Sequence, residues 1–156
     1  MRISSSAFQD GKPIPTKYAH PGVTGGKNIS LPLAWTDVPP EAKSFALSIV
    51  DPHPVANNWV HWIAVNIPRS ASGLAEGASG ASMPPGSKEL YNTYGMLGYG
   101  GPEPPKGSGP HPYIVTLHAL NVESLDLAAN ISLSAFGKAL EGKIIASAKM
   151  TGIYER

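Results

Sequence analysis

Three apolar runs, each bounded by proline, glycine or asparagine, constrain the fold of this chain most strongly. They are FALSIVD at 45–51, VHWIAVNI at 60–67 and YIVTLHAL at 113–120. Branched and aromatic side chains dominate all three, which predicts β-strands. A shorter run at 31–35 predicts a further strand. Because no regular alternation of strand and helix patterns links the runs, parallel βαβ units are not indicated and a β-rich sheet protein is expected.

Helix signals are confined to the end of the chain. Residues 70–94 are rich in Gly, Ala and Ser and predict a long excursion with little regular structure, of a kind that is often functional. A length of 156 residues suits a single domain over 1–156, mostly β with some helix (β-rich α+β). One or two C-terminal helices are predicted, because apolar residues recur there at helical spacing in two groups: Leu133, Phe136 and Leu140, then Ile144, Ile145 and Ala148.

Composition argues against several classes of function. Twelve Lys and Arg against eleven Asp and Glu leave a formal net charge of +1, so neither nucleic acid nor an anionic membrane is an expected partner. The absence of cysteine excludes disulfides, thiolate metal sites and a cysteine nucleophile. No apolar run approaches the ~18 residues of a membrane span, and the opening MRISSSAFQDGKPIP lacks the apolar core of a signal peptide. A cytoplasmic protein is therefore expected.

Each of the three runs places a titratable side chain at one end of an otherwise apolar face. Side chains alternate between the two faces of a strand, so Asp51 ends the apolar face of the first run and His61 begins a face shared with Ile63. Tyr113 begins the face of the third run, with His111 two residues before it. If these ends meet, as antiparallel pairing would allow for Asp51 and His61, they form a small polar pocket over an apolar floor.

Several chemistries are open to these residues in principle. Asp51, His53, His61 and His111 are of metal-ligand types, but the chain has no His-x-x-x-His spacing, and a metal is not expected. No Gly-x-Ser-x-Gly elbow, GxxxxGK[ST] loop or GxGxxG stretch after a strand occurs, so neither a Ser-His-Asp hydrolase nor a nucleotide site is indicated. General acid–base catalysis by His61 or His111 stays open, although no activated nucleophile is identifiable.

An anion-binding site requires fewer specific residues than a metal, hydrolase or nucleotide site. Imidazoles that can protonate, a tyrosine hydroxyl and backbone N–H groups in glycine-rich turns can together receive phosphate or carboxylate. The stretch YGGPEPPKGSGPHPY at 99–113 supplies such turns; its glycines allow close backbone approach and its prolines lower the entropy cost of order. We expect Asp51 to orient His61 or His111 and to favour imidazolium, so that anion binding weakens as pH rises.

Five segments in order resemble the phosphatidylethanolamine-binding proteins, a family that includes Raf kinase inhibitor protein, and most closely their small bacterial and archaeal branch. The segments are SSAFQDGKPIP, NISLPLAW, DPHPVANNWVHWIAVNIP, GYGGPEPPKGSGPHPY and AKMTGIYER, and they span nearly the whole chain. The resemblance implies a central antiparallel sheet, a second smaller sheet and C-terminal helices. It also implies a shallow pocket for phosphate, phosphorylethanolamine-like or acetate-like anions, and a binding or inhibitory role without enzymatic activity.

Candidate site residues follow from the family motifs. No catalytic residue and no cofactor is expected. An alternative hypothesis is a protein inhibitor of serine proteases or kinases that acts through surface loops such as 70–94, and the chain could form a homodimer. The resemblance carries pocket roles over to matching positions, to which a rim histidine and a tryptophan wall are added: Asp51, His61, His111 and Tyr113, framed by Gly101, Pro102 and Pro105, with His53 and Trp59.

Three positions depart from the family pattern. This chain has His53, Glu103 and Pro112 where relatives usually carry Asp, Cys and Arg. His53 exchanges an acidic group for one that can donate or become cationic, and Glu103 removes redox chemistry from the loop. Pro112 lacks a backbone N–H, so pairing at that point inside a central ladder is not expected. These departures bear on the identity of the ligand more than on the fold.

Overall fold

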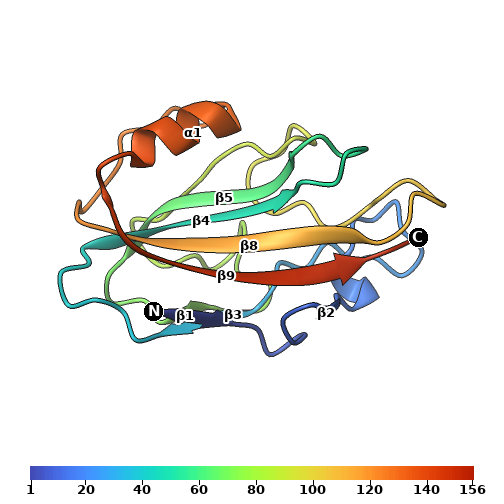
Figure 1. Cartoon of the computed structure of the whole chain (residues 1–156), viewed down its shortest axis with the longest axis horizontal. Coiled ribbons are helices and arrows are strands. Elements are labelled where there is room, and N and C mark those ends of the chain that lie inside the picture. The colour runs from blue at the N-terminus through green and yellow to red at the C-terminus, as the bar shows by residue number, and fades with distance from the viewer.

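The computed structural model describes all 156 residues and contains two β-sheets and one α-helix (Figure 1). All strand pairs are antiparallel except β2 with β9. This arrangement confirms the mostly-β class and the second, smaller sheet. The larger sheet consists, in spatial order, of β2 (Lys12–Pro13), β9 (Ile144–Tyr154), β8 (His111–Leu120), β4 (Ser44–Asp51), β5 (Trp59–Pro68) and β7 (Lys88–Glu89), and the smaller of β1 (Arg2–Ser4), β3 (Leu33–Thr36) and β6 (Gly73–Leu74).

The larger sheet buries apolar side chains on both faces. One face packs on the smaller sheet, where Trp35 of β3 meets Phe45 of β4 within a cluster of 24 buried residues. The other face is partly covered by α1 (Leu133–Leu140), whose Phe136 and Leu140 belong to a second cluster of nine. Ser132 caps the helix by accepting the Ala135 N–H, as expected at an N-terminus. The first predicted helix is thus confirmed.

The second predicted helix is wrong. Ile144–Tyr154 forms β9, which pairs along its length with β8. A spacing of four residues, as between Ile144 and Ala148, is helical but is also an even number of strand positions, so the pattern could not separate the two structures. Gly142, with φ of +70°, turns the chain sharply between α1 and β9.

The predicted face of His61 is also wrong, because β5 contains a bulge. Ile49 of β4 pairs with Trp62 whereas Val50 pairs with Val60, so His61 is an extra residue. Trp62 packs between the two sheets, whereas Ile63 packs on the helix side. The bulge therefore turns His61 toward Tyr113 and away from the face of Ile63.

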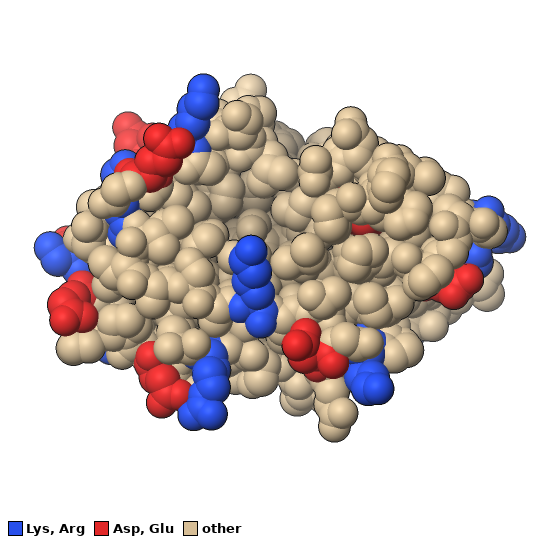
Figure 2. Space-filling view, in the orientation of Figure 1, with Lys and Arg blue, Asp and Glu red and all other residues tan.

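The excursion at 70–94 contains only the two-residue strands β6 and β7, as its composition predicts. It is nevertheless held in place by Glu89, whose carboxylate accepts hydrogen bonds from Trp62 Nε1 and Ser79 Oγ at 2.7 and 2.6 Å and from the Gly80 N–H at 2.8 Å. Basic and acidic side chains are interspersed on the face shown in Figure 2, with no patch of one sign. No helix has both the length and the apolar character required to cross a bilayer.

Candidate functional site

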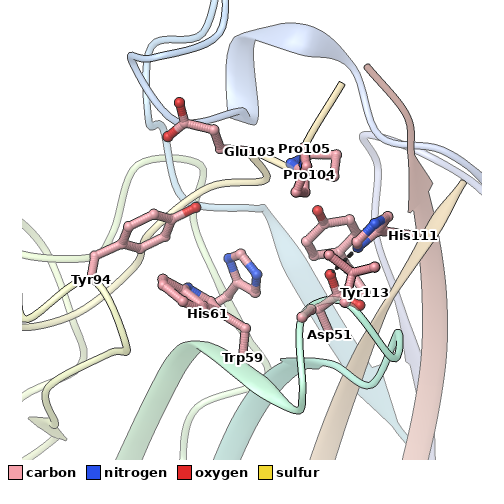
Figure 3. Close-up of a pocket in the computed structure, with 11 residues that line it drawn as sticks. Asp51, Trp59, His61, Tyr94, Glu103, Pro104, Pro105, His111 and Tyr113 are labelled. Carbon is pink, nitrogen blue, oxygen red and sulfur yellow. Dashed lines mark hydrogen bonds and ion pairs between the residues drawn. The ribbon is translucent and has the colours of Figure 1, made fainter. Parts of the chain in front are cut away.

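A cavity of about 230 Å³ opens where β4 ends and where β5 and β8 begin (Figure 3). It brings together six of the nine predicted residues and leaves His53, Gly101 and Pro102 outside its lining. Loops between the strands contribute the remaining walls. The lining consists of Asp51, Val55, Ala56, Trp59, His61, Tyr94, Glu103, Pro104, Pro105, His111 and Tyr113.

Asp51 orients His111 rather than His61. Both side chains are buried, and Asp51 Oδ2 lies 2.5 Å from His111 Nδ1. The other ring nitrogen, Nε2, lies 2.9 Å from Ser108 Oγ, and that hydroxyl is 2.6 Å from the Pro105 carbonyl. Because a carbonyl can only accept, the single hydrogen of Ser108 goes to Pro105 and the ring donates to Ser108. His111 therefore has both nitrogens engaged within the protein.

His53 supports this pair from the side. Its backbone N–H donates to Asp51 Oδ1 at 2.9 Å, and its ring stacks on that of His111 with centroids 3.8 Å apart. Its own Nδ1 accepts the Val55 N–H at 3.2 Å. His53 thus fixes the turn after β4 and covers His111, instead of lining the cavity as predicted.

His61 is held in one orientation. Its Nδ1 lies 2.7 Å from the Gly100 carbonyl, and the Gly100 N–H returns a bond of 2.8 Å to the His61 carbonyl. The edges of Tyr94 and Tyr113 pack against the ring. Burial lowers the pKa of His61 from 6.5 to about 4, although the bond to Gly100 acts in the opposite direction. The charge of Asp51 also raises this pKa, as expected, but burial outweighs it, so the expectation that His61 is an imidazolium near neutral pH is wrong.

Gly101 and Pro102 position the framing loop, defined as residues 98–105. A Cβ on Gly101 would lie 2.1 Å from the Tyr18 carbonyl oxygen, so only glycine fits this approach. The Gly101 N–H donates to Asn28 Oδ1 at 2.7 Å, and the Pro102 carbonyl accepts the His20 N–H at 3.0 Å. These two residues join the loop to the N-terminal part of the chain and hold Pro104 and Pro105 over the cavity.

The rim contains groups that strand patterns could not identify. Tyr94 donates its hydroxyl hydrogen to the Gly101 carbonyl at 2.9 Å and stacks on His20, with centroids 4.5 Å apart. Glu103 Oε2 lies 2.6 Å from His20 Nδ1, and Arg156 approaches the same carboxylate at 3.5 Å. Tyr94 and Glu103 both come from irregular segments, where alternation gives no signal.

Two side chains of the cavity lining, Trp59 and Tyr113, carry hydrogen-bond donors. Trp59 Nε1 is buried without an acceptor, which is rare for an indole N–H and calls for an explanation. The Tyr113 side chain is buried, and burial raises the pKa of its hydroxyl, which therefore keeps its hydrogen at neutral pH. Figure 3 shows His61, Tyr94 and Tyr113 around one space. The arrangement can bind a small polar group against apolar walls.

Pro112 lies where its missing N–H costs little. The pairing of β8 with β4 ends at Ile114 opposite Val50, so Pro112 has a partner only in β9, where it stands opposite Ile153. As expected, it is not part of a ladder with strands on both sides.

Sequence comparisons agree along the whole chain. The model of the family described as phosphatidylethanolamine-binding protein matches residues 4–155. The chain is 42% identical over 157 residues to a UPF0098 protein of Methanothermobacter thermautotrophicus, with 100% of this chain and 99% of that protein covered. It is 37% identical over 158 residues to the UPF0098 protein YbhB of Escherichia coli, with 99% of each covered.

Solved structures give the same result. The crystal structure of E. coli YbcL, described as a new member of the mammalian PEBP family, superposes with a TM-score of 0.92 at 34% identity, covering 99% of this chain and 98% of that one. A phosphatidylethanolamine-binding protein homologue from Chlamydia trachomatis superposes with a TM-score of 0.85 at 37% identity, covering 99% of this chain and 97% of that one. The chain therefore belongs to the phosphatidylethanolamine-binding protein family.

Proposed function

We propose that the cavity binds a small anion, such as phosphate or a phosphorylethanolamine-like head group, and that the protein acts as a non-catalytic binding protein with a regulatory or inhibitory role. The observation that carries this proposal is a cavity in which the Tyr113 hydroxyl and the His61 ring stand among apolar side chains such as Val55, Pro104 and Pro105. A hydroxyl that can donate into such a cavity is what an oxygen atom of an anion can satisfy. Family membership supports a binding role.

The size of the cavity supports a head group and not a whole lipid. At about 30 Å³ per water, 230 Å³ corresponds to roughly eight waters. Phosphorylethanolamine, with about eight non-hydrogen atoms, is of this size, whereas glycerol and acyl chains would have to remain outside. Pro104 and Pro105 line the cavity in the framing loop and present apolar surface without N–H groups.

Titration calorimetry with phosphate and with phosphorylethanolamine tests the proposal. Tyr113→Phe should weaken binding by about three- to tenfold, the value of one hydrogen bond, while leaving the ring packing in place. Tyr91→Phe is the matched control, because Tyr91 is 43% exposed and outside the cavity. If the wild type binds neither compound at millimolar concentration, the proposal is wrong.

The non-catalytic assignment is supported by the direction of hydrogen bonds around Ser108. Asp51, His111 and Ser108 form a row in the order of a Ser-His-Asp triad. In a triad the serine donates to histidine, whereas here the Ser108 hydrogen goes to the Pro105 carbonyl at 2.6 Å. We expect no hydrolysis of p-nitrophenyl acetate above the background rate. Turnover that disappears in Ser108→Ala would contradict this expectation.

A second candidate function is inhibition of a serine protease or kinase through a surface loop. The segment 91–97, closed by a bridge between Tyr91 and Leu97, exposes three apolar side chains: Tyr91 at 43%, Met96 at 41% and Leu97 at 55%. Exposed apolar side chains grouped on one loop are typical of interaction sites. Inhibition assays against panels of both enzyme classes test this candidate, with Leu97→Ser as the variant. Absence of inhibition throughout would remove it.

A further inference from the structure

His61 presents a hydrogen-bond acceptor to the cavity and not a donor. Its Nδ1 faces the Gly100 carbonyl at 2.7 Å, and because that oxygen can only accept, Nδ1 carries the hydrogen. The reciprocal bond from the Gly100 N–H fixes the carbonyl in turn. A neutral imidazole has one N–H, so the remaining nitrogen, Nε2, has a lone pair.

The surroundings keep this ring neutral. His61 is only 3% exposed, and its pKa lies near 4 because burial penalises the charged form. The Asp51 carboxylate on β4 raises this pKa, but it is bound to His111 at 2.5 Å and its effect is smaller than that of burial. The titratable and charged groups that face the ring come from β4, β8 and the loops: Asp51, His111, Tyr113, Tyr94, Glu103 and His20.

We propose that the pocket selects an oxyanion that still carries one acidic hydrogen, which it donates to Nε2 of His61. The ligand class is thus a phosphate monoester in its monoanionic form, and oxyanions of equal charge without a hydroxyl are disfavoured. This inference rests on the proposed anion-binding function and names its ligand class.

The donor and acceptor pattern of the cavity matches that class. An oxygen of a monoester monoanion can accept from the Tyr113 hydroxyl, while its P–O–H donates to His61. A sulfate monoester has the same charge and a similar shape, but it brings an oxygen lone pair against the lone pair of Nε2. It can bind well only when His61 itself is protonated. For this pocket, the phosphate and sulfate monoesters therefore differ in the hydrogen atom that only the phosphate can donate to Nε2.

The two ligands should differ in pH dependence. A phosphate monoester loses its second proton near pH 6, so its binding should hold between about pH 4 and pH 6 and then fall about tenfold per pH unit. Methyl sulfate has no such proton, so its binding should already fall above about pH 4, where His61 becomes neutral. At about pH 5.5, methyl sulfate should bind more than about tenfold more weakly than methyl phosphate.

Titration calorimetry of the wild-type protein at about pH 5.5 with methyl phosphate, methyl sulfate and dimethyl phosphate tests this inference. His61→Asn is the control variant, because the asparagine amide can still donate to the Gly100 carbonyl while the acceptor at Nε2 is gone. In that variant the preference for methyl phosphate should shrink to within about threefold. Nitrogen NMR of the wild-type histidines reports the His61 tautomer without any ligand.

The outcomes separate this inference from the proposed function. Equal or tighter binding of methyl sulfate by the wild type overturns the ligand class while anion binding stands. A protonated Nε2 on His61 at neutral pH also overturns it, whatever binds. If none of the three compounds binds at millimolar concentration, the anion pocket itself is refuted and the inference with it.

Discussion

The Asp51 carboxylate should contribute several kcal/mol to folding. In Asp51→Ala, the buried His111 ring loses its partner at 2.5 Å and the His53 N–H loses its acceptor at 2.9 Å. Removing one member of such a buried pair costs about 3–5 kcal/mol, because the other group stays buried without compensation. For a chain of this length, that loss should lower Tm by about 6–20 °C.

Urea unfolding followed by the fluorescence of the buried Trp35 and Trp62 measures this loss, with Asp51→Asn as the matched variant. The asparagine amide keeps an oxygen for the His53 N–H and keeps a polar group opposite His111 Nδ1, so a loss of about 1–2 kcal/mol is expected. Losses that are equal in the two variants, or a loss below about 1 kcal/mol in Asp51→Ala with an unchanged m value, would refute the role assigned to this carboxylate.

Three further predictions concern the loop, the histidine and the tryptophan. Gly101→Ala should destabilise the protein by more than about 2 kcal/mol, because the new Cβ meets the Tyr18 carbonyl at 2.1 Å. Gly137→Ala in α1, with open space around it, should stabilise by about 0.5–1 kcal/mol. Denaturation midpoints that move in the same direction would contradict one of the two predictions. The pKa of His61 falls from 6.5 to about 4 on folding, so its contribution is present above about pH 6.5 and is lost as pH falls toward 4. The shift corresponds to about 3 kcal/mol, and the drop in stability between about pH 7 and pH 4 should be smaller in His61→Asn than in the wild type. Trp59→Phe should change the free energy of unfolding by less than about 1 kcal/mol, since Nε1 has no partner; a larger shift in urea denaturation would contradict this reading of the indole.

Sequence patterns located much of the site because β4 and β8 are regular where they meet it. The two strands pair without a register shift, so alternation correctly brought Asp51, His111 and Tyr113 together. The face of His61 could not be predicted, because the extra residue of a bulge reverses the alternation that follows it and leaves no mark in local composition. A second irregularity of β5 lies near Asn66, which has φ of +58°. It reverses the alternation again, so that Ile67 packs between the two sheets.

The remaining errors arise where tertiary contacts decide the structure. β9 has helical spacing in its first residues, and its long pairing with β8 overrides that local preference. Tyr94, Glu103 and Ser108 enter the site through turns, where the positions of side chains depend on distant backbone. Their contacts follow from the folded loop and not from any spacing within it.

The contacts of the framing loop also have a kinetic consequence. Asn28 bonds the Tyr99 carbonyl and Gly101, which lie 71 and 73 residues away, and the Tyr99 hydroxyl donates to the Tyr18 carbonyl across 81 residues. Closing loops of this length costs entropy before any contact repays it, so these bonds should form after β4 has paired with β5, whose partners lie only 8 to 24 residues apart. Substitutions at Asn28 or Tyr99 should therefore speed unfolding while leaving the refolding rate almost unchanged.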